Sequence, residues 1–150
     1  ALFGSKYFRN GYLAFLVPII ALWFCDLIIN NFVLSQYFDG FTLFYSGFYW
    51  QYGSFLLITL LGRKTLNNMS FLKLLGVSIS SSLLFFIISN FGVWISSSIY
   101  SKNILGLIAC YTAAIPFYFG TLSGSVFYSF FLFGSYELLS KNTSKVFTNK

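Results

Sequence analysis

Long segments without a charged side chain are the feature that most constrains the fold of this chain. Residues 74–101 and 103–136 contain no Lys, Arg, Asp or Glu. Only 8% of the 150 residues are charged, whereas a soluble domain carries about 25%. So few charges cannot cover a surface exposed to water, and lipid is therefore the expected solvent.

The apolar segments predict an all-α integral membrane protein, a bundle of about five to six transmembrane helices in the single domain 1–150. A helix needs ~20 apolar residues to cross the hydrocarbon core. Because the chain starts inside an apolar stretch, we expect the bundle to be short at its N-terminal end. The predicted spans are 1–8 (partial), 11–29, 41–62, 69–90 and 122–139.

The segment 104–119 is apolar but short, and Pro116 interrupts it. If it crossed the membrane, the 9 basic residues would be divided almost evenly between the two sides, against the positive-inside rule. If it is re-entrant or lies on the outer face, every Lys and Arg except Lys102 lies on one side, including the basic tail 140–150. We therefore favour this second topology in a bacterial inner (cytoplasmic) membrane, with segment 90–103 facing outward.

The net charge of +6 does not indicate a nucleic-acid-binding protein, because no basic cluster accompanies a polar surface. The charges lie in short loops between apolar runs, so the anionic head groups of the lipid bilayer are the expected partner. The two cysteines, Cys25 and Cys110, lie in apolar segments, and the chain has no CxxC motif and no histidine. We therefore expect no disulfide scaffold, no metal site and no cofactor.

Catalytic residues are not expected in this sequence. It has no His to act as a general base, no closely spaced pair of carboxylates and no nucleophile elbow. It also lacks the P-loop motif that holds the phosphates of ATP. We therefore expect that the chain is not an enzyme, and that the energy for any transport comes from a gradient or a partner.

Four residues near the expected outer end are candidates for binding a small molecule: Asp26, Asn90, Trp94 and Tyr100. A carboxylate inside a spanning segment indicates function by default, although Asp26 can equally be an interfacial residue that caps a neighbouring element. The side chain of Asn90 offers both donors and an acceptor. The rings of Trp94 and Tyr100 can stack on a ligand, although an interfacial Trp is also common in the aromatic belt of membrane proteins.

Small residues predict close contacts between helices. Gly76 and Ser80 belong to a small-residue patch in segment 69–90, and Gly120 and Gly124 form a GxxxG pair. Both features indicate helix packing within the chain first, and contact with another membrane protein second.

Three tyrosines add a further pattern to segment 41–62. Tyr45, Tyr49 and Tyr52 recur at i, i+4 and i+7, which predicts three phenols on one helix face. With Gln51 nearby, this face either packs against a neighbouring helix or lines a cavity.

Five blocks of sequence together carry a resemblance to a known family: ALFGSKYF, LAFLVPIIALWFCDLI, SNFGVW, GLIACYTAAIPF and LFGSYELL. In this order they resemble a family of uncharacterised bacterial transport proteins, which is similar to the substrate-binding S components of energy-coupling factor (ECF) transporters. The resemblance runs from Ala1 to about Leu139. It implies an S-component-like six-helix bundle that captures a small molecule at its outer face. A separate ECF-type coupling protein and two ATPases would then drive release.

The chain departs from this family pattern at several polar positions. The family has a basic residue, an Asn and an Asp where Phe119, Gly120 and Ser125 stand here, and a Pro where Ser101 follows Tyr100. Two functions therefore stay open. The first is capture and uptake of a small molecule, and the second is a non-transporting structural or accessory subunit of a larger bacterial envelope membrane complex.

Overall fold

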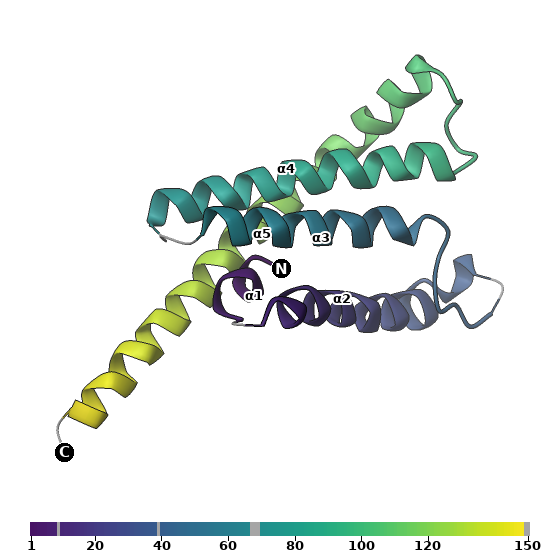
Figure 1. The fold of residues 1–150 in the computed structure, drawn as a ribbon. Helices are drawn as coiled ribbons and strands as arrows, with labels where there is room; N and C mark the ends of the chain where they lie inside the picture. The colour runs from purple at the N-terminus through teal and green to yellow at the C-terminus, as the bar shows by residue number, and fades with distance from the viewer. Residues whose placement is uncertain (9, 39, 67–69, 149–150) are drawn as a thin grey trace.

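The computed structural model describes residues 1–8, 10–38, 40–66 and 70–148, with side chains as far as Ser140. All regular structure in this part of the chain is helical, which confirms the predicted all-α class. The elements in Figure 1 are α1 (Leu2–Tyr7), α2 (Gly11–Ile28), the π-helical turn η1 (Ile29–Val33), the 3-10 turn η2 (Ser35–Tyr37), α3 (Phe48–Thr65), α4 (Phe71–Ser96) and α5 (Ile104–Thr148).

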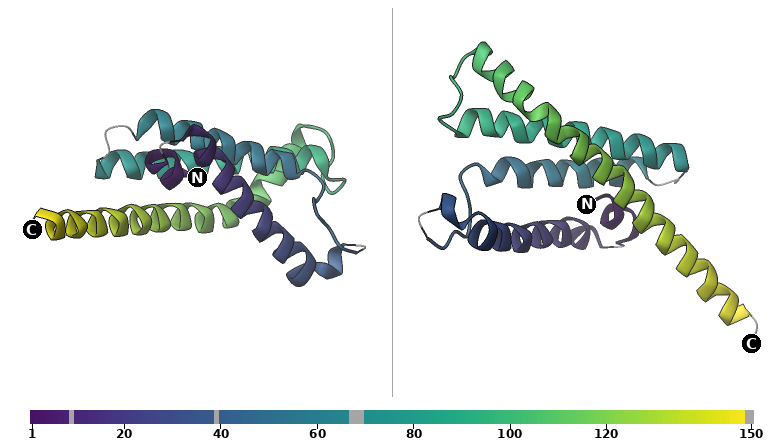
Figure 2. Two further views of the ribbon diagram at one scale, coloured as in Figure 1. Left: turned by 60° about the horizontal axis from the view of Figure 1, so that its bottom comes forward. Right: turned by 180° about the vertical axis from the view of Figure 1, so that it is seen from behind.

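Helices α3 and α4 run side by side in the middle of the bundle (Figure 1). Helix α5 packs against α4 and crosses it obliquely, so that its C-terminal half extends beyond the other helices (Figure 2). Helix α2 contacts α1 and α3, and the short α1 also contacts α5. The end of the bundle that holds the loop between α4 and α5 and the start of α3 is called the mouth end here. The opposite end is called the base end.

Three segments of the described chain are helical, long and apolar enough to cross a membrane: Gly11–Val33, Phe71–Ser96 and Ile104–Ser140. The structure therefore fits a membrane location, but three candidate spans replace the predicted five to six. Helix α1 has 6 residues, about 9 Å of helix, which is far short of a ~30 Å hydrocarbon core. Helix α3 has 18 residues, but the polar Gln51 and the basic Arg63 lower its mean hydropathy. It is therefore not among the three candidate spans.

Segments 104–119 and 122–139, which the sequence predicts as separate elements, form one continuous helix, α5. Pro116 lies inside this helix and does not end it. A proline removes one backbone N–H from a helix, and spanning helices tolerate the loss because neighbouring groups and small local adjustments compensate for it. Helix α5 starts at the mouth end and ends beyond the base end (Figure 1). The tail thus follows α5 to the end of the bundle that the favoured topology requires, but through one continuous helix and not through two separate elements.

Helix α4 extends further toward the mouth end than predicted. Its start is capped by Ser70, whose Oγ accepts a hydrogen bond from the backbone N–H of Lys73 at 3.3 Å. Its other end continues through residues 91–96, which the sequence predicts as part of a loop. The ring of Phe91 packs edge-on against Trp50 of α3, with 5.3 Å between the ring centroids. This contact with α3 supports helical turns that the local sequence does not specify.

Helix α3 begins later than predicted, at Phe48, so Tyr45 precedes it. The preceding Gly47 has a φ of 83°, in the left-handed region that glycine adopts without strain. The three tyrosines therefore do not form one helix face, as their spacing predicts. Instead, Tyr49 lies close to Ser96 of α4, whereas Tyr52 bonds to α2.

Small buried serines lie where α4 meets its neighbours. Ser78 is 0% and Ser82 is 2% exposed. Their hydroxyls donate to the carbonyls of Leu74 and Ser78 in the same helix, both at 2.8 Å, so neither hydroxyl is left unsatisfied. Small side chains let neighbouring helices approach closely, and this packing is a main source of stability in lipid.

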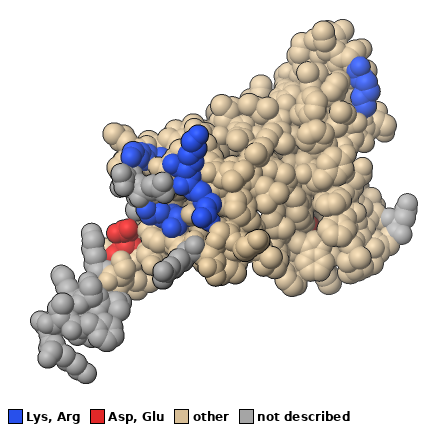
Figure 3. All heavy atoms as spheres, in the orientation of Figure 1, with Lys and Arg blue, Asp and Glu red and all other residues tan. Residues whose placement is uncertain are grey.

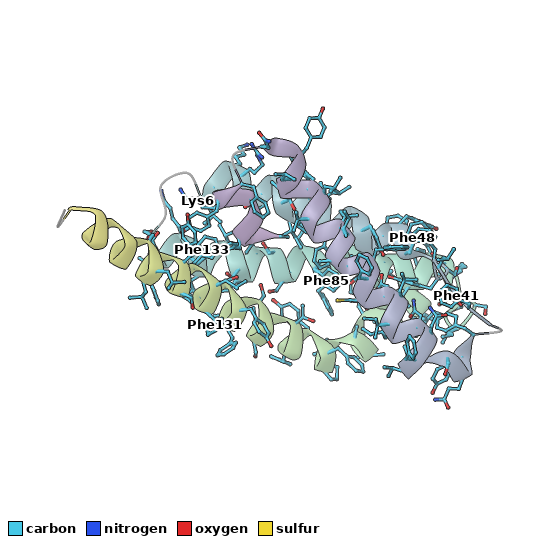
Figure 4. All side chains as sticks on the ribbon, turned by 90° about the horizontal axis from the view of Figure 1, so that it is seen from below. Lys6, Phe41, Phe48, Phe85, Phe131 and Phe133 are labelled. Carbon is cyan, nitrogen blue, oxygen red and sulfur yellow. The ribbon has the colours of Figure 1, made fainter. Side chains whose placement is uncertain are left out.

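An aromatic cluster at the base end joins α1 to α5. The ring centroid of Phe133 lies 5.5 Å from those of Phe3 and Tyr7, and Phe133 is only 1% exposed. Figure 4 shows Phe133 directed toward the bundle and Phe131 directed away from it. The cluster therefore holds α1 against α5, in addition to the contacts that α1 makes with α2 and α3.

The described basic side chains gather at the base end, apart from one (Figure 3). Lys6 lies in the last turn of α1, Arg63 and Lys64 lie in the last turn of α3, and Lys73 lies in the first turn of α4. Lys102 lies at the mouth end, in the loop between α4 and α5. This division agrees with the one that the favoured topology predicts.

A hydrogen bond between α1 and α5 makes the base end sensitive to alkaline pH. Tyr7 Oη donates to Glu137 Oε1 at 3.1 Å. Burial and then the Glu137 carboxylate raise the pKa of Tyr7 from 10.0 to about 12. The folded protein thus holds this proton more tightly than the unfolded chain does. The stability that Tyr7 contributes is fully present below a pH of about 10 and is lost as the pH rises toward about 12.

We therefore expect the unfolding temperature to fall between pH 10 and pH 12, as measured by circular dichroism in detergent. The fall should be smaller in Tyr7→Phe, because phenylalanine keeps the ring contacts and has no proton to lose. Equal slopes for the two proteins over this window would show that the Tyr7–Glu137 bond is not responsible.

Candidate functional site

The mouth end brings a carboxyl group together with three polar side chains, here called the mouth cluster: Asp26, Tyr45, Gln51 and Tyr52. Tyr52 Oη donates to Asp26 Oδ2 at 3.0 Å and links α3 to α2. Tyr45 Oη donates to Gln51 Oε1 at 2.5 Å. Burial and then the charge of Asp26 raise the pKa of Tyr45 above its usual value, so this phenol stays neutral beside the carboxylate. The cluster therefore combines one carboxyl group with neutral hydrogen-bonding groups.

A cavity of about 250 Å³, here called the mouth cavity, lies between the start of α3 and the end of α4. Tyr45 and Gln51 of the mouth cluster line it, together with Trp50. No Lys, Arg, Asp or Glu side chain is among its lining residues. The volume is just below the ~300–1,000 Å³ that is usual for drug-sized ligands. The cavity therefore suits a small polar molecule, or one part of a larger one.

Two hydrogen-bonding groups of the mouth cavity have no partner among the described residues. They are Nε1 of Trp50 and Oγ of Ser97, and both atoms are buried. A buried polar group without a partner costs about 1–3 kcal/mol. Such groups therefore mark positions where a ligand or a water molecule completes the hydrogen bonding.

Gly92 allows the indole of Trp50 to lie directly against α4. A Cβ atom added at Gly92 would stand 2.5 Å from Trp50 Cβ and would overlap the ring as well. No side chain larger than glycine fits there unless α3 and α4 move apart. This close approach forms one wall of the mouth cavity, because both residues line it.

The structure places the four predicted ligand residues at the mouth end without joining them in one site. Asp26 belongs to the mouth cluster, whereas the side-chain amide of Asn90 donates to a backbone carbonyl of its own helix at 2.8 Å. Trp94 bonds to the loop that follows α4, and Tyr100 is a half-buried residue of that loop. None of the four lines the mouth cavity. Direct ligand binding by these residues therefore stays a prediction.

The loop 97–103 is folded back onto the end of α4. Trp94 Nε1 donates to the carbonyl of Ser101 at 3.0 Å. Lys102 Nζ donates to the carbonyls of Trp94 and Ser97, and it lies 5.9 Å from the centroid of the Trp94 ring. A cation at this position satisfies carbonyls at the helix C-terminus and opposes the negative end of the helix dipole. Trp94 and Lys102 thus hold the loop 97–103 against the end of α4.

The residues that shape the mouth cavity or leave a polar group unpartnered in it were not among the sequence candidates: Trp50, Gly92 and Ser97. Gly92 carried a usable signal, since an isolated glycine inside a helical pattern often has a packing reason. From sequence alone, however, Trp50 cannot be told from a residue of the aromatic belt, and Ser97 cannot be told from a solvated loop serine.

The predicted packing residues do not make close helix contacts within the chain. Gly76 and Ser80 are exposed on α4, and a Cβ at Gly76 would meet no neighbouring atom within 4 Å. A Cβ at Gly120 or Gly124 would likewise meet no neighbouring atom within 4 Å. Both glycines line a second cavity. Contact of these four residues with a partner protein stays a prediction.

The described residues contain no group of three or more His, Cys, Asp or Glu side chains that could hold a metal ion. The described part of the chain therefore offers no metal centre to the candidate site.

No curated protein and no solved structure matches the chain. A family model described as a family of unknown function, DUF6580, matches residues 1–147. The matched range includes every residue of the mouth cluster and of the mouth cavity. The match provides no link to ECF S components. The chain therefore belongs to the family of unknown function DUF6580.

Proposed function

We propose that this chain is a multi-pass protein of the bacterial inner membrane that captures a small polar molecule at its mouth end for uptake. The observation that carries the proposal is the pair of buried, unpartnered groups in the mouth cavity, Trp50 Nε1 and Ser97 Oγ. A ligand with acceptor atoms would complete the hydrogen bond of the indole. The five sequence blocks that resemble a family of uncharacterised bacterial transport proteins, itself similar to S components of ECF transporters, are in keeping with the same function.

The distribution of charge supports an outward-facing mouth end. The positive-inside rule places the base end, with Arg63, Lys64 and Lys73, on the cytoplasmic side. Anionic lipid head groups would be the partners of these side chains. The mouth cavity would then open toward the outside of the cell, where a ligand has to be captured.

Within this proposal, the mouth cluster holds the cavity in shape. Tyr45 and Gln51 line the cavity and bond to each other, and Asp26 ties Tyr52 and therefore α3 to α2. The sequence has no P-loop, so uptake would depend on a separate ECF-type coupling protein and ATPases. The chain itself would contribute recognition and no catalytic step.

A second candidate function is a non-transporting structural or accessory subunit of a larger envelope membrane complex. Gly76 and Ser80 favour it, because they form a small-residue face of α4 that no other described element covers. Faces of this kind let a helix of another protein approach closely in a membrane.

One purification from native membranes in mild detergent tests both functions. We expect a small molecule to be retained by the natural protein and to be identified by mass spectrometry of the extracted ligand fraction. Gln51→Leu should reduce the retained amount by about 10-fold or more, because it leaves polar ligand atoms unpaired in the cavity. Gln36→Leu is the matched control, since Gln36 is exposed and lies outside the cavity.

The proteins recovered in the same purification distinguish the two functions. A coupling membrane protein together with ATPases would support uptake. A large envelope assembly without ATPases, and equal ligand fractions for Gln51→Leu and Gln36→Leu, would exclude uptake and favour the subunit function.

A further inference from the structure

A second cavity, here called the inner cavity, lies between the helices and is partly open to the surface of the bundle. Its volume is about 460 Å³, and residues of α1, α3, α4 and α5 line it. It shares no lining residue with the mouth cavity. Aromatic rings, including those of Phe55 and Phe85, form part of its wall, and Figure 4 shows Phe85 in the interior of the bundle. No Lys, Arg, Asp or Glu side chain lines the inner cavity.

Ser81 gives the inner cavity an unsatisfied hydrogen-bonding group. The residue is 3% exposed, it lines the cavity, and its Oγ has no partner among the described residues. Three other hydroxyls of the wall already donate to backbone carbonyls: Ser82 and Ser125 donate to Ser78 at 2.8 and 3.2 Å, and Thr121 donates to Phe117 at 3.2 Å. Ser81 therefore still has its proton to donate to a guest.

Gly120 and Gly124 provide space in the inner cavity. Both line it, and a Cβ at either position would meet no neighbouring atom within 4 Å. The GxxxG pair is thus not used for close packing of α5 within the chain. It widens the cavity opposite the serines of α4.

The depth of Ser81 restricts the chemistry of the guest. Ser81 lies ten residues after Phe71, the first residue of α4, which is about 15 Å along the helix axis. This is half of a ~30 Å hydrocarbon core. Phospholipid esters and head groups lie at the membrane interface, so they do not reach Ser81. The atom that accepts a hydrogen bond from Ser81 therefore has to belong to a molecule that lies near the middle of the membrane.

We infer that the inner cavity binds a compact, uncharged, ring-containing molecule with a carbonyl-type acceptor, to which Ser81 Oγ–H donates. The absence of charged side chains from the lining favours an uncharged guest, because no side chain would offset the desolvation of an ion. The aromatic wall favours a ring, since aromatic groups pack well in edge-to-face and offset-stacked arrangements. The volume is within the ~300–1,000 Å³ range of small-molecule sites. This inference does not depend on the function proposed for the mouth cavity.

Benzophenone tests the inference, because it is uncharged, has two rings and a carbonyl group, and crosslinks to its surroundings under light. We expect saturable labelling of the purified chain in lipid nanodiscs, mapped by peptide mass spectrometry to residues of the inner cavity. Gly124→Leu should fill the cavity and reduce saturable labelling by about 10-fold or more, since a bulky side chain occupies the guest's volume. Gly134→Leu is the matched control, because Gly134 also has open space around it but does not line the cavity.

Ser81→Ala tests the hydrogen bond separately and should keep the packing of the fold, since it only removes one oxygen atom. It should weaken benzophenone binding by about 2- to 10-fold, which corresponds to one neutral hydrogen bond. Diphenylmethane has the same two rings without the carbonyl group. Its potency as a competitor should therefore be the same against the natural protein and against Ser81→Ala.

Several results would overturn the inference. Labelling that does not saturate would show simple partition into lipid. Equal labelling of Gly124→Leu and Gly134→Leu, or of the natural protein and Ser81→Ala, would show that the guest lies elsewhere. A stable dimer that Gly124→Leu alone converts to monomers, as measured by size-exclusion chromatography with light scattering, would show that the cavity receives a helix of a second copy.

Discussion

Gly92→Ala should lower the free energy of unfolding by about 1–3 kcal/mol, the usual cost of an added methyl group in a well-packed contact. The new Cβ would stand 2.5 Å from Trp50 Cβ, and these atoms belong to the rigid start of the Trp50 side chain. Relief therefore requires α3 and α4 to separate at the mouth end. Circular dichroism during a titration from mild detergent into sodium dodecyl sulfate measures the effect.

Gly76→Ala is the control for this prediction, with the same substitution in the same helix. A Cβ at Gly76 would meet no neighbouring atom within 4 Å, so alanine should raise stability by up to about 1 kcal/mol through its better helix propensity. Opposite signs for the two variants are thus expected. If Gly92→Ala were as stable as Gly76→Ala, the close contact between α3 and α4 would be absent from the folded protein.

Trp50→Gly provides a second check, because it removes both the Cβ atom and the ring that an alanine at 92 would strike. Combined with Gly92→Ala, it should reduce the cost of the alanine, and the double-mutant cycle should give a coupling of about 0.5–3 kcal/mol, as for residues in direct contact. Additive effects of the two substitutions would count against the proposed geometry of the mouth cavity wall.

Phe133→Ala should lower the free energy of unfolding by about 3 kcal/mol, the lower end of the range for a buried Phe→Ala change. The lower end applies because lipid or detergent surrounds the chain in both states, so the loss comes from packing more than from transfer out of water. Phe133 is 1% exposed and contacts Phe3 and Tyr7 of α1. Its removal should therefore release α1 from α5.

Phe131→Ala is the matched control on the same helix. Phe131 is 60% exposed and is directed away from the bundle (Figure 4), so its loss should change stability by no more than about 0.5 kcal/mol. Limited proteolysis near residues 1–8 provides a local measurement. Faster cleavage there is expected in Phe133→Ala only, and equal cleavage of both variants would contradict the role of the aromatic cluster.

The candidate site shows how far sequence reasoning reaches. Asp26 was identified from its rarity, since a carboxylate inside an apolar segment stands out in the sequence alone. Its partner Tyr52 belongs to a different helix, and the bond depends on how α2 and α3 lie against each other. Asn90 and Trp94 were chosen because they are polar or aromatic residues at the expected outer end. The structure shows that both side chains bond to the backbone instead.

The sequence by itself determined the helical class, the apolar helices that fit a membrane, and the separation of Lys102 from the other described basic residues. These properties depend on composition and on short-range order, because a run of apolar residues is apolar in any fold. Only the tertiary structure decided that α5 continues past Pro116, that α4 extends to Ser96, and that serines and glycines surround an inner cavity. Each of these results depends on contacts between residues that are far apart in the sequence. A local pattern cannot specify such contacts, since the same segment is stable in more than one arrangement until its neighbours are in place.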